Sequence, residues 1–392
     1  MVFAISGCFL LFRLILYTKK YKNRTIVYSV MVCVVFAFLT LFMVRLRGVG
    51  GLGGILNFIR LLTVFIFVMM MNNDEKKNIV SMTTNLYAWI VGISMAGYMF
   101  LLMGLNLPYS IIMVPDDLFY PPMQNYGIFI LLSSDGRFDN FFRFQSVFTE
   151  PGHLGTISAI LLYVNRYELK RKSVLVIFIS VLLSLSFAAY VLAGLGYLIC
   201  IIAKSKNFYK TILKIGIVTT LVFVLGLYYY ERHPDSIFSI VVLSRFGFGD
   251  GITATEALEG RTRGINHFYE TQFLTSTRSF LWGANLTESQ HFVLFGRGGV
   301  NSYRVFLIQN GIIAMILLLL MYFSIVAIAP SKLGFGLLFL CSMSFLQRIQ
   351  VPLWEMHLFI FVGAVQCYYA PKNLIKAKNE ILCKSGLGLT NI

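Results

Sequence analysis

The sequence predicts an all-α polytopic integral membrane protein with about eleven transmembrane helices, forming one membrane domain over residues 1–392. Hydrophobic residues make up 57% of the chain, charged residues only 13%, and the mean hydropathy is +0.75. A soluble domain has about 45–50% apolar and about 25% charged residues. Apolar runs of bilayer-spanning length recur along the chain, and the lysines cluster between them. Together these observations exclude a soluble globular domain.

The predicted spans are nearly uncharged runs, most of them of about 15 to 22 residues, which is long enough, or nearly so, to cross a bilayer. The run at 172–203 must turn near Ser184–Ala188, whereas the apolar segment 126–132 is too short to cross and is interpreted as re-entrant or interfacial. The run at 1–17 has no preceding basic region and no small-residue cleavage site, which favours a retained span. The predicted spans are 2–18, 25–44, 52–71, 86–106, 152–165, 172–185, 187–203, 212–229, 311–329, 333–347 and 354–370.

Charge orients these helices through the positive-inside rule. With eleven spans and a cytoplasmic C-terminus, all sixteen lysines fall in, or within about a turn of, the inside segments. Sixteen Lys and three Arg less four acids give +15 inside, and twelve Arg less thirteen acids give −1 outside; Arg13 and Arg60, within spans, complete the net +16. Nucleic-acid binding is not needed to explain the basic charge. The inside segments are 19–24, 72–85, 166–171, 204–211, 330–332 and 371–392.

The predicted outer face carries the chemistry. Its two long loops, 107–151 and 230–310, contain Arg but no Lys, and all five histidines fall outside. A planar guanidinium binds phosphate or carboxylate through two parallel hydrogen bonds, which a Lys ammonium cannot do. For any single Arg, a weak surface ion pair with one of the outer acids is the simpler interpretation. For the whole set, the absence of Lys favours binding of an anionic ligand.

The segment Arg143–Gly155 places an Arg, a carboxylate and a His around a predicted helix start. Thr149 is the expected cap, with Glu150 and Pro151 in the first turn, where a carboxylate meets the positive end of the helix dipole. Capping alone would explain Glu150, and His153, about one turn further on, would then only satisfy a backbone carbonyl.

No metal or organic cofactor is expected. The six cysteines show no metal-ligand spacing and no even set in one loop, so neither a zinc site nor a disulfide framework is indicated. No pair of carboxylates has a convincing spacing for Mg²⁺.

A series of loose motifs resembles a known family. Phe-x-Glu-Pro-x-x-Leu-Gly opens a span at 148–155, and a Ser-rich turn follows at 184–186. The large outer loop contains an Arg and a Trp at 278–282 and a Gly-rich end at 296–299, before Asn301-Ser302-Tyr303 and Gly311-Ile312-Ile313. Over about 140–330 this resembles the O-antigen and capsule repeat-unit polymerases, which share a GT-C-like fold with the O-antigen ligases.

The resemblance implies transfer of a growing glycan from undecaprenyl diphosphate to a sugar hydroxyl of the next lipid-linked unit, on the outer face of the bacterial inner membrane. A lipid diphosphate leaves as a stable anion and needs cations more than a general acid. The candidate substrate-binding residues are Arg143, Arg261, Arg263, Arg278 and Arg297. The candidate bases are Glu150 first, then His153, Glu259 and His267. The expected partners are the lipid-linked oligosaccharide, the bilayer and, as a candidate, a chain-length regulator protein.

Two positions depart from the family pattern. Ligases usually carry a His where this chain has Val300, which argues against a ligase, and many members carry an Arg where it has Phe187. The rival from another class is a transporter or flippase, but the chain shows no evident repeat and one candidate midplane charge, Arg60. For an O-acetylating or other envelope-modifying enzyme, no compelling nucleophile or His–acid motif is present.

Overall fold

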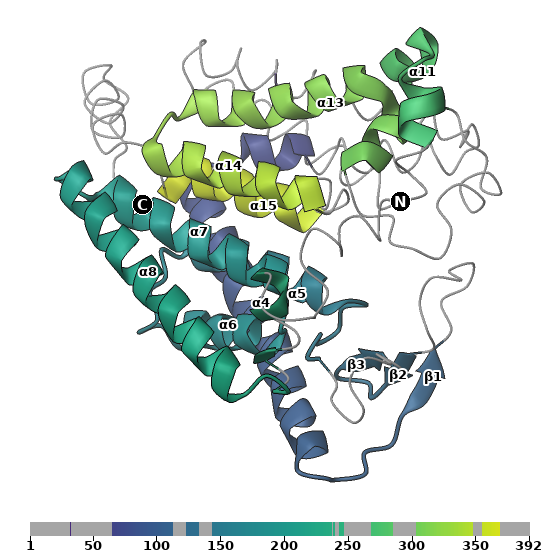
Figure 1. The fold of residues 1–392 in the computed structure, drawn as a ribbon. Coiled ribbons are helices and arrows are strands. Elements are labelled where there is room, and N and C mark those ends of the chain that lie inside the picture. The colour runs from purple at the N-terminus through teal and green to yellow at the C-terminus, as the bar shows by residue number, and fades with distance from the viewer. Residues whose placement is uncertain are drawn as a thin grey trace, which may run out of the picture.

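Helices make up most of the described part of the chain in the computed structural model (Figure 1). The structure describes residues 32, 65–112, 123–132, 143–236, 238–239, 243–246, 268–284, 303–347 and 355–368. In this part of the chain four helices are long and apolar enough to cross a bilayer: α4 (Asn73–Leu102), α7 (Phe187–Lys204), α8 (Phe208–Arg232) and α13 (Tyr303–Ile328). These apolar helices indicate a membrane protein.

The other elements are shorter. The apolar ones are α5 (Pro151–Val164), α6 (Lys172–Leu183), α14 (Lys332–Gln347) and α15 (Glu355–Gly363). The remaining helical turns are η1 (Leu243–Phe246), η2 (Tyr269–Phe273), α11 (Thr277–Trp282) and η4 (Ala364–Tyr368). Three strands, β1 (Ser110–Ile112), β2 (Met123–Asn125) and β3 (Ile130–Leu132), form one antiparallel sheet.

This small sheet, with three residues in each strand, is an addition to the helices that the sequence predicts. The segment 126–132, predicted to be re-entrant or interfacial, forms the tight turn between β2 and β3 and the strand β3 itself. Gly127 supplies the left-handed backbone of the turn, with φ at +81°, and its N–H donates to Asn125 Oδ1 over 2.9 Å. Phe129 and Leu131 are buried at a spacing of two residues, as a strand requires.

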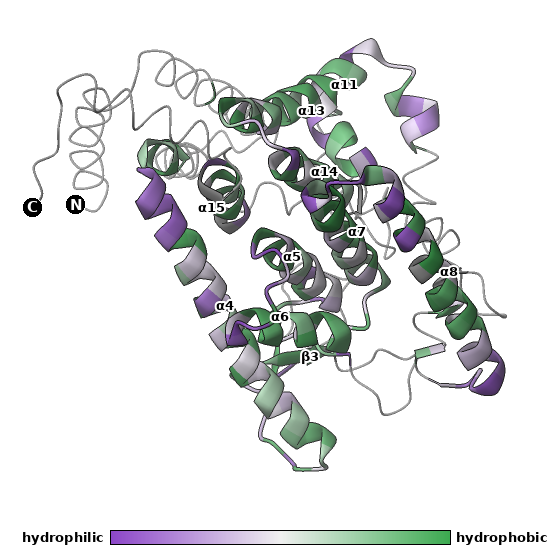
Figure 2. Cartoon of the chain, turned by 90° about the vertical axis from the view of Figure 1, so that its left-hand side faces the viewer, coloured by the Kyte–Doolittle hydropathy of each residue, from purple (hydrophilic) through white to green (hydrophobic). Residues whose placement is uncertain are grey.

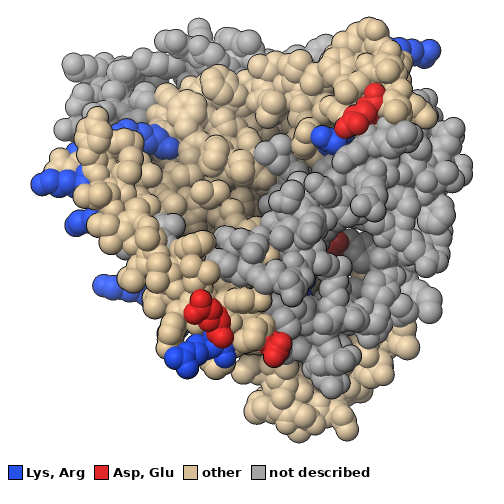
Figure 3. All heavy atoms as spheres, viewed as in Figure 1, with Lys and Arg blue, Asp and Glu red and all other residues tan. Residues whose placement is uncertain are grey.

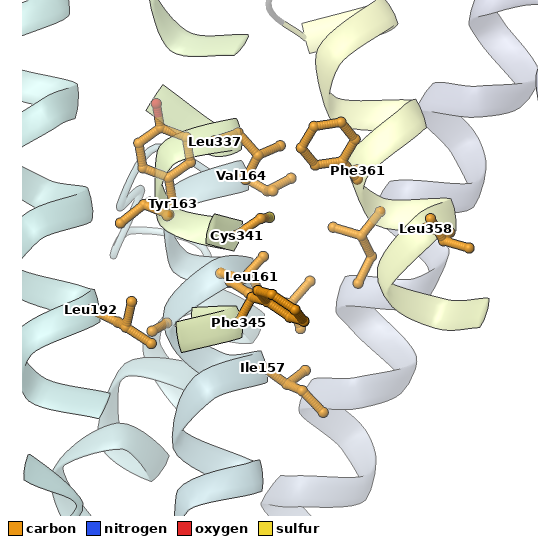
Figure 4. Packing of buried hydrophobic residues seen from close by; sticks show 14 of the residues in the cluster. Ile157, Leu161, Tyr163, Val164, Leu192, Leu337, Cys341, Phe345, Leu358 and Phe361 are labelled. Atoms are coloured by element: carbon orange, nitrogen blue, oxygen red, sulfur yellow. The ribbon is translucent and has the colours of Figure 1, made fainter. Parts of the chain in front are cut away.

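Helix α5 is the centre of the bundle. Every residue of α5 except His153 is buried, and neighbours from α4, α6, α7, α14 and α15 surround it. Figure 4 shows side chains of α5, α7, α14 and α15 meeting at Leu161 and Cys341. With 14 residues α5 is only about 21 Å long, shorter than the roughly 30 Å core of a bilayer. It is therefore a buried core helix enclosed by its neighbours.

The direction of each helix follows from its contacts with α5. Helix α4 runs antiparallel to α5, since Thr84 contacts Asn165, Tyr87 contacts Ser158 and Tyr98 packs on Phe144. Helix α7 runs parallel to α5, with Ala189 facing Gly155 and Gly196 facing Tyr163. Helix α14 begins where α5 ends, because Tyr163 donates to the Leu333 carbonyl over 2.8 Å.

These directions define two ends of the bundle. At the lysine end, α4 begins, α5 and α7 finish and α14 begins; at the opposite end, called the strap end, lie the start of α5 and the sheet. The described lysines lie at or near the lysine end: Lys76, Lys77, Lys170, Lys172, Lys204, Lys206, Lys210, Lys214 and Lys332. In Figure 3 the blue side chains gather on the left, over the α7–α8 connection, and Figure 2 shows apolar helix middles with polar tips. Lysine is thus sorted to one end, as the sequence predicts.

The start of α4 corrects a predicted loop. Residues 72–85 were expected to be an inside loop, but the helix begins at Asn73 with a capping box. Asn72 Oδ1 accepts from the Glu75 N–H over 2.8 Å, and Glu75 Oε2 accepts from the Asn72 N–H over 2.9 Å. Lys76 is buried, and its ammonium donates to the Met69 carbonyl over 3.1 Å and to Gln366 Oε1. Polar composition concealed this first part of the helix.

The last eight predicted spans each overlap a described helix, and the predicted turn near Ser184–Ala188 lies between Leu183 and Phe187. Helices α4, α8 and α13 extend beyond their predicted bounds, and α13 has a kink at Gly311, where φ is 75°. The predicted spans 2–18, 25–44 and 52–71 lie outside the described residues, apart from residues 32 and 65–71.

Candidate functional site at the start of helix α5

Residues 143–150, here called the strap, lead directly into α5 and begin with Arg143. The helix starts one residue later than predicted: Glu150, with extended backbone angles (φ −141°, ψ 142°), is the N-cap, and Pro151 is the first helical residue. The expectation that Thr149 caps α5 is therefore wrong. Neither residue makes a side-chain cap hydrogen bond; instead the Glu150 carbonyl accepts from the His153 N–H over 3.1 Å. Capping does not explain the Glu150 carboxylate.

His153 lies beside the strap at the start of α5. It is half-buried, and its Nδ1 lies 3.5 Å from Thr149 Oγ1. Glu150, Thr149 and His153 are all partly accessible in an otherwise buried helix start. Glu150 and His153 lie within one helical turn of each other at this helix start.

Arg143 joins the strap to the turn between α6 and α7. Its Nε donates to the Ser184 carbonyl over 3.3 Å, and its Nη2 donates to the Leu185 carbonyl over 3.1 Å. Leu185 has a left-handed backbone, with φ at 45°, which is rare for a residue with a branched side chain. The guanidinium therefore stabilises an unusual turn in addition to any contact with a ligand.

Gly155 allows this turn to lie against α5. A Cβ built on Gly155 would overlap the Cβ of Ala189 and lie 3.3 Å from Ser184 Oγ. Only glycine lets α7 approach this closely, in the manner of small-residue contacts between membrane helices. Gly155 and Arg143 thus bring the Ser-rich turn, the strap and the start of α5 together.

The strap has two energetically costly features on consecutive residues. The side chain of Gln145 is 1% exposed, and its Nε2 has no hydrogen-bond partner among the described residues. An unpaired buried donor costs about 1–3 kcal/mol. Ser146 has φ at 53°, which costs of order 1–3 kcal/mol for a residue other than glycine. Packing and hydrogen bonds hold the strap in place despite this: Ser146 Oγ donates to Ser94 Oγ over 2.9 Å, and its carbonyl accepts from the Ile130 N–H over 2.8 Å.

A second cationic group lies at the start of α13. The Arg304 guanidinium carbon is 5.0 Å from the centre of the Tyr269 ring, which also stacks on Phe273 at 5.3 Å. Burial raises the pKa of Tyr269, and Tyr303 acts in the same direction while Arg304 opposes it. Sequence reasoning missed Arg304; its signal was the position directly after Asn301-Ser302-Tyr303.

The end of α11 docks on the kink of α13. The Ala284 N–H donates to the Ile308 carbonyl over 2.7 Å, and a Cβ on Gly283 would lie 2.5 Å from the Gln309 carbonyl oxygen. Gly283 and Gly311 both have left-handed angles, with φ at 88° and 75°. This contact attaches Arg278, exposed on α11, to the start of α13.

The two cationic groups share one end of the bundle. Helix α13 runs antiparallel to α14, as Phe306 packs on Phe345 at 5.3 Å, so Arg304 and α11 lie at the strap end. The strap carries Arg143, Glu150 and His153 at that same end. The other predicted site residues, Glu259, Arg261, Arg263, His267 and Arg297, lie outside the described residues.

Among the described residues, no three His, Cys, Asp or Glu side chains lie together in a way that would hold a metal ion. No protein-family model, curated protein or solved structure matches this chain. Function must therefore be inferred from these residues and their arrangement.

Proposed function

We propose that this protein is a multi-pass glycosyltransferase of the bacterial inner membrane that polymerises lipid-linked oligosaccharide repeat units. The observation that carries the proposal is the grouping of Arg143, Glu150 and His153 at the start of the most buried helix, at the end opposite the lysines. By the positive-inside rule the lysine end is cytoplasmic, so the strap faces the extracytoplasmic side. In this proposal the chain forms an eleven-span GT-C-like domain, and the extracytoplasmic loops 107–151 and 230–310 form the active site.

The reaction is a displacement at the first carbon of the growing glycan. The acceptor hydroxyl oxygen forms a bond to that carbon, and the bond from the carbon to the lipid diphosphate oxygen breaks. The diphosphate leaves with the electron pair, and the hydroxyl proton passes to the base. Glu150 is the base because its carboxylate is partly accessible and not used as a helix cap. His153 is the next candidate.

The arginines stabilise the anion that leaves. The undecaprenyl diphosphate carries its charge on oxygens that match the guanidinium geometry, so bidentate Arg contacts suit it. Arg278 is exposed at the strap end. Arg304, held against Tyr269, adds a cation there, and Arg261, Arg263 and Arg297 remain candidates from the sequence. No metal is needed for charge neutralisation by this set.

Glu150→Gln tests the assignment of the base. Removal of a general base lowers the rate about 10²–10⁴-fold, whereas loss of a charge near a helix start costs only about 0.3–1 kcal/mol of stability. We therefore expect normal membrane protein level and lost polymerisation. The matched control is Glu270→Gln, an exposed acid of η2 at the same end, which should remain active. Polymerisation by Glu150→Gln at more than a tenth of the normal rate would show that Glu150 is not the base.

Purified protein and an undecaprenyl-diphosphate-linked repeat unit test the function as a whole. A ladder of longer lipid-linked glycans is the expected product. Transfer to a lipid A core acceptor without chain growth would identify a ligase instead. Movement of the lipid-linked unit across vesicle membranes without any transfer would identify a transporter.

A further inference from the structure

The amide of Gln145 is one of the buried polar groups that the proposed reaction does not use. Its side chain is 1% exposed, and Nε2 has no partner among the described residues. The Gln145 carbonyl accepts from the Phe148 N–H over 3.0 Å, which forms a turn directly before Thr149 and Glu150. This donor therefore belongs to the strap, two residues from Arg143.

Buried atoms elsewhere in the described part of the chain also lack a partner, among them Asn310 Oδ1, at the α13 kink, and His357 Nε2, in α15. Neither is part of the strap. An unpaired donor in a native core calls for an explanation, and a group that pairs only with a ligand is one such explanation. Gln145 lies in the strap between a cation, Arg143, and a candidate base, Glu150, so a ligand bound at the strap is the partner that fits its place in the chain.

We propose that Gln145 Nε2 donates a hydrogen bond to an oxygen of the saccharide bound at the strap, so that Gln145 selects the sugar. This inference rests on the proposed function. A neutral amide suits a sugar hydroxyl or acetamido oxygen, whereas a diphosphate is better served by Arg. Sites that pair a buried polar group with a substrate discriminate strongly, because the wrong substrate leaves that group unpaired.

We expect the sugar to approach Gln145 from the exposed part of the strap. Val147, the second residue after Gln145, is 42% exposed, so the strap reaches the surface. Ser146, the residue after Gln145, has a left-handed backbone, with φ at 53°. We expect the strap to move when the saccharide binds, which would release this strain and lower the cost of exposing the amide.

Gln145→Met tests the proposal, because Met has a similar length and no donor. With Nε2 unpaired in the resting protein, the variant should unfold at the same temperature as the wild type or higher, while polymerisation falls about ten- to a hundredfold. The free repeat-unit oligosaccharide should raise the unfolding temperature of the wild type and not that of Gln145→Met. Gln145→Glu, which keeps the shape and replaces the donor with a carboxylate oxygen, should also lose the response.

Each outcome decides between the alternatives. A stable Gln145→Met protein with normal activity and normal saccharide response would show that the buried amide does not bind the saccharide and only lowers the stability of the fold. A protein that unfolds at a clearly lower temperature would show that the amide is already paired in the resting state, and would also refute the proposal. A wild-type protein that responds to the saccharide through Gln145 but makes no polymer would contradict the polymerase function alone. A wild-type protein with neither property would contradict both.

Discussion

Gly155→Ala tests the contact that holds the site together. Gly155 lies in the second turn of α5, and α7 passes so close that a Cβ there would overlap the Cβ of Ala189. A Cβ on residue 155 would lie less than 3.0 Å from the Cβ of Ala189, a separation that real Cβ atoms essentially never show. A single methyl group must therefore push α5 and α7 apart, and the turn at 184–186 moves with α7.

The expected change in the free energy of unfolding is the sum of two opposing effects. Extra volume in a well-packed core costs about 1–3 kcal/mol, and the rigid backbone on both sides puts Gly155→Ala toward the upper part of that range. Ala gains about 0.5–1 kcal/mol over Gly in a helix interior. The matched control is Gly194→Ala in α7, where nothing lies within 4 Å of a new Cβ, so that only the gain remains. We expect Gly155→Ala to lower the free energy of unfolding and Gly194→Ala to raise it. The difference between the two variants should be roughly 1–3 kcal/mol.

Thermal unfolding of the purified variants in detergent measures this difference, alongside protein level in the membrane. Gly155→Ala should unfold several degrees below the wild type and Gly194→Ala at or slightly above it. Polymerisation by Gly155→Ala should fall further than the loss of protein explains, because the turn that binds Arg143 is displaced. Equal unfolding temperatures for the two variants would refute the close approach of α5 and α7.

Arg143→Lys should lower both stability and activity, because a single ammonium cannot replace the two hydrogen bonds to the Ser184 and Leu185 carbonyls; unfolding temperature and glycan length measure this. Arg278→Lys, at an exposed position, should lose activity with unchanged stability if it binds diphosphate bidentately, and retained long glycan would exclude that role. Cysteine at position 206, in a cysteine-free background, should resist an impermeant maleimide in intact cells, while cysteine at position 147 should react. Labelling at 206 alone would invert the orientation and remove the strap from the extracytoplasmic face.

The sequence alone determined the membrane class, the positions of the later helices and the sorting of lysine to one end. It also located the turn at 184–186 and the start of α5 to within one residue. These features depend on local composition: an apolar run must be helical in a bilayer, because lipid offers no partner for backbone N–H and C=O groups. The position of lysine is likewise a local property, because positively charged loops are retained on the cytoplasmic side of the membrane.

Only the tertiary structure decided which helix is central and which groups meet. Helices α5 and α8 are both apolar in sequence, yet α5 is buried and the apolar window of α8 is not. The partners of Arg143 lie 41 and 42 residues away in the chain. Arg304, at the start of α13, likewise contacts the ring of Tyr269 in η2. The absence of a partner for Gln145 Nε2 among the described residues is likewise invisible in the sequence, since pairing depends on what surrounds a side chain. Burial and hydrogen bonding are decided by contacts between distant segments, and hydropathy along the chain carries no information about those contacts.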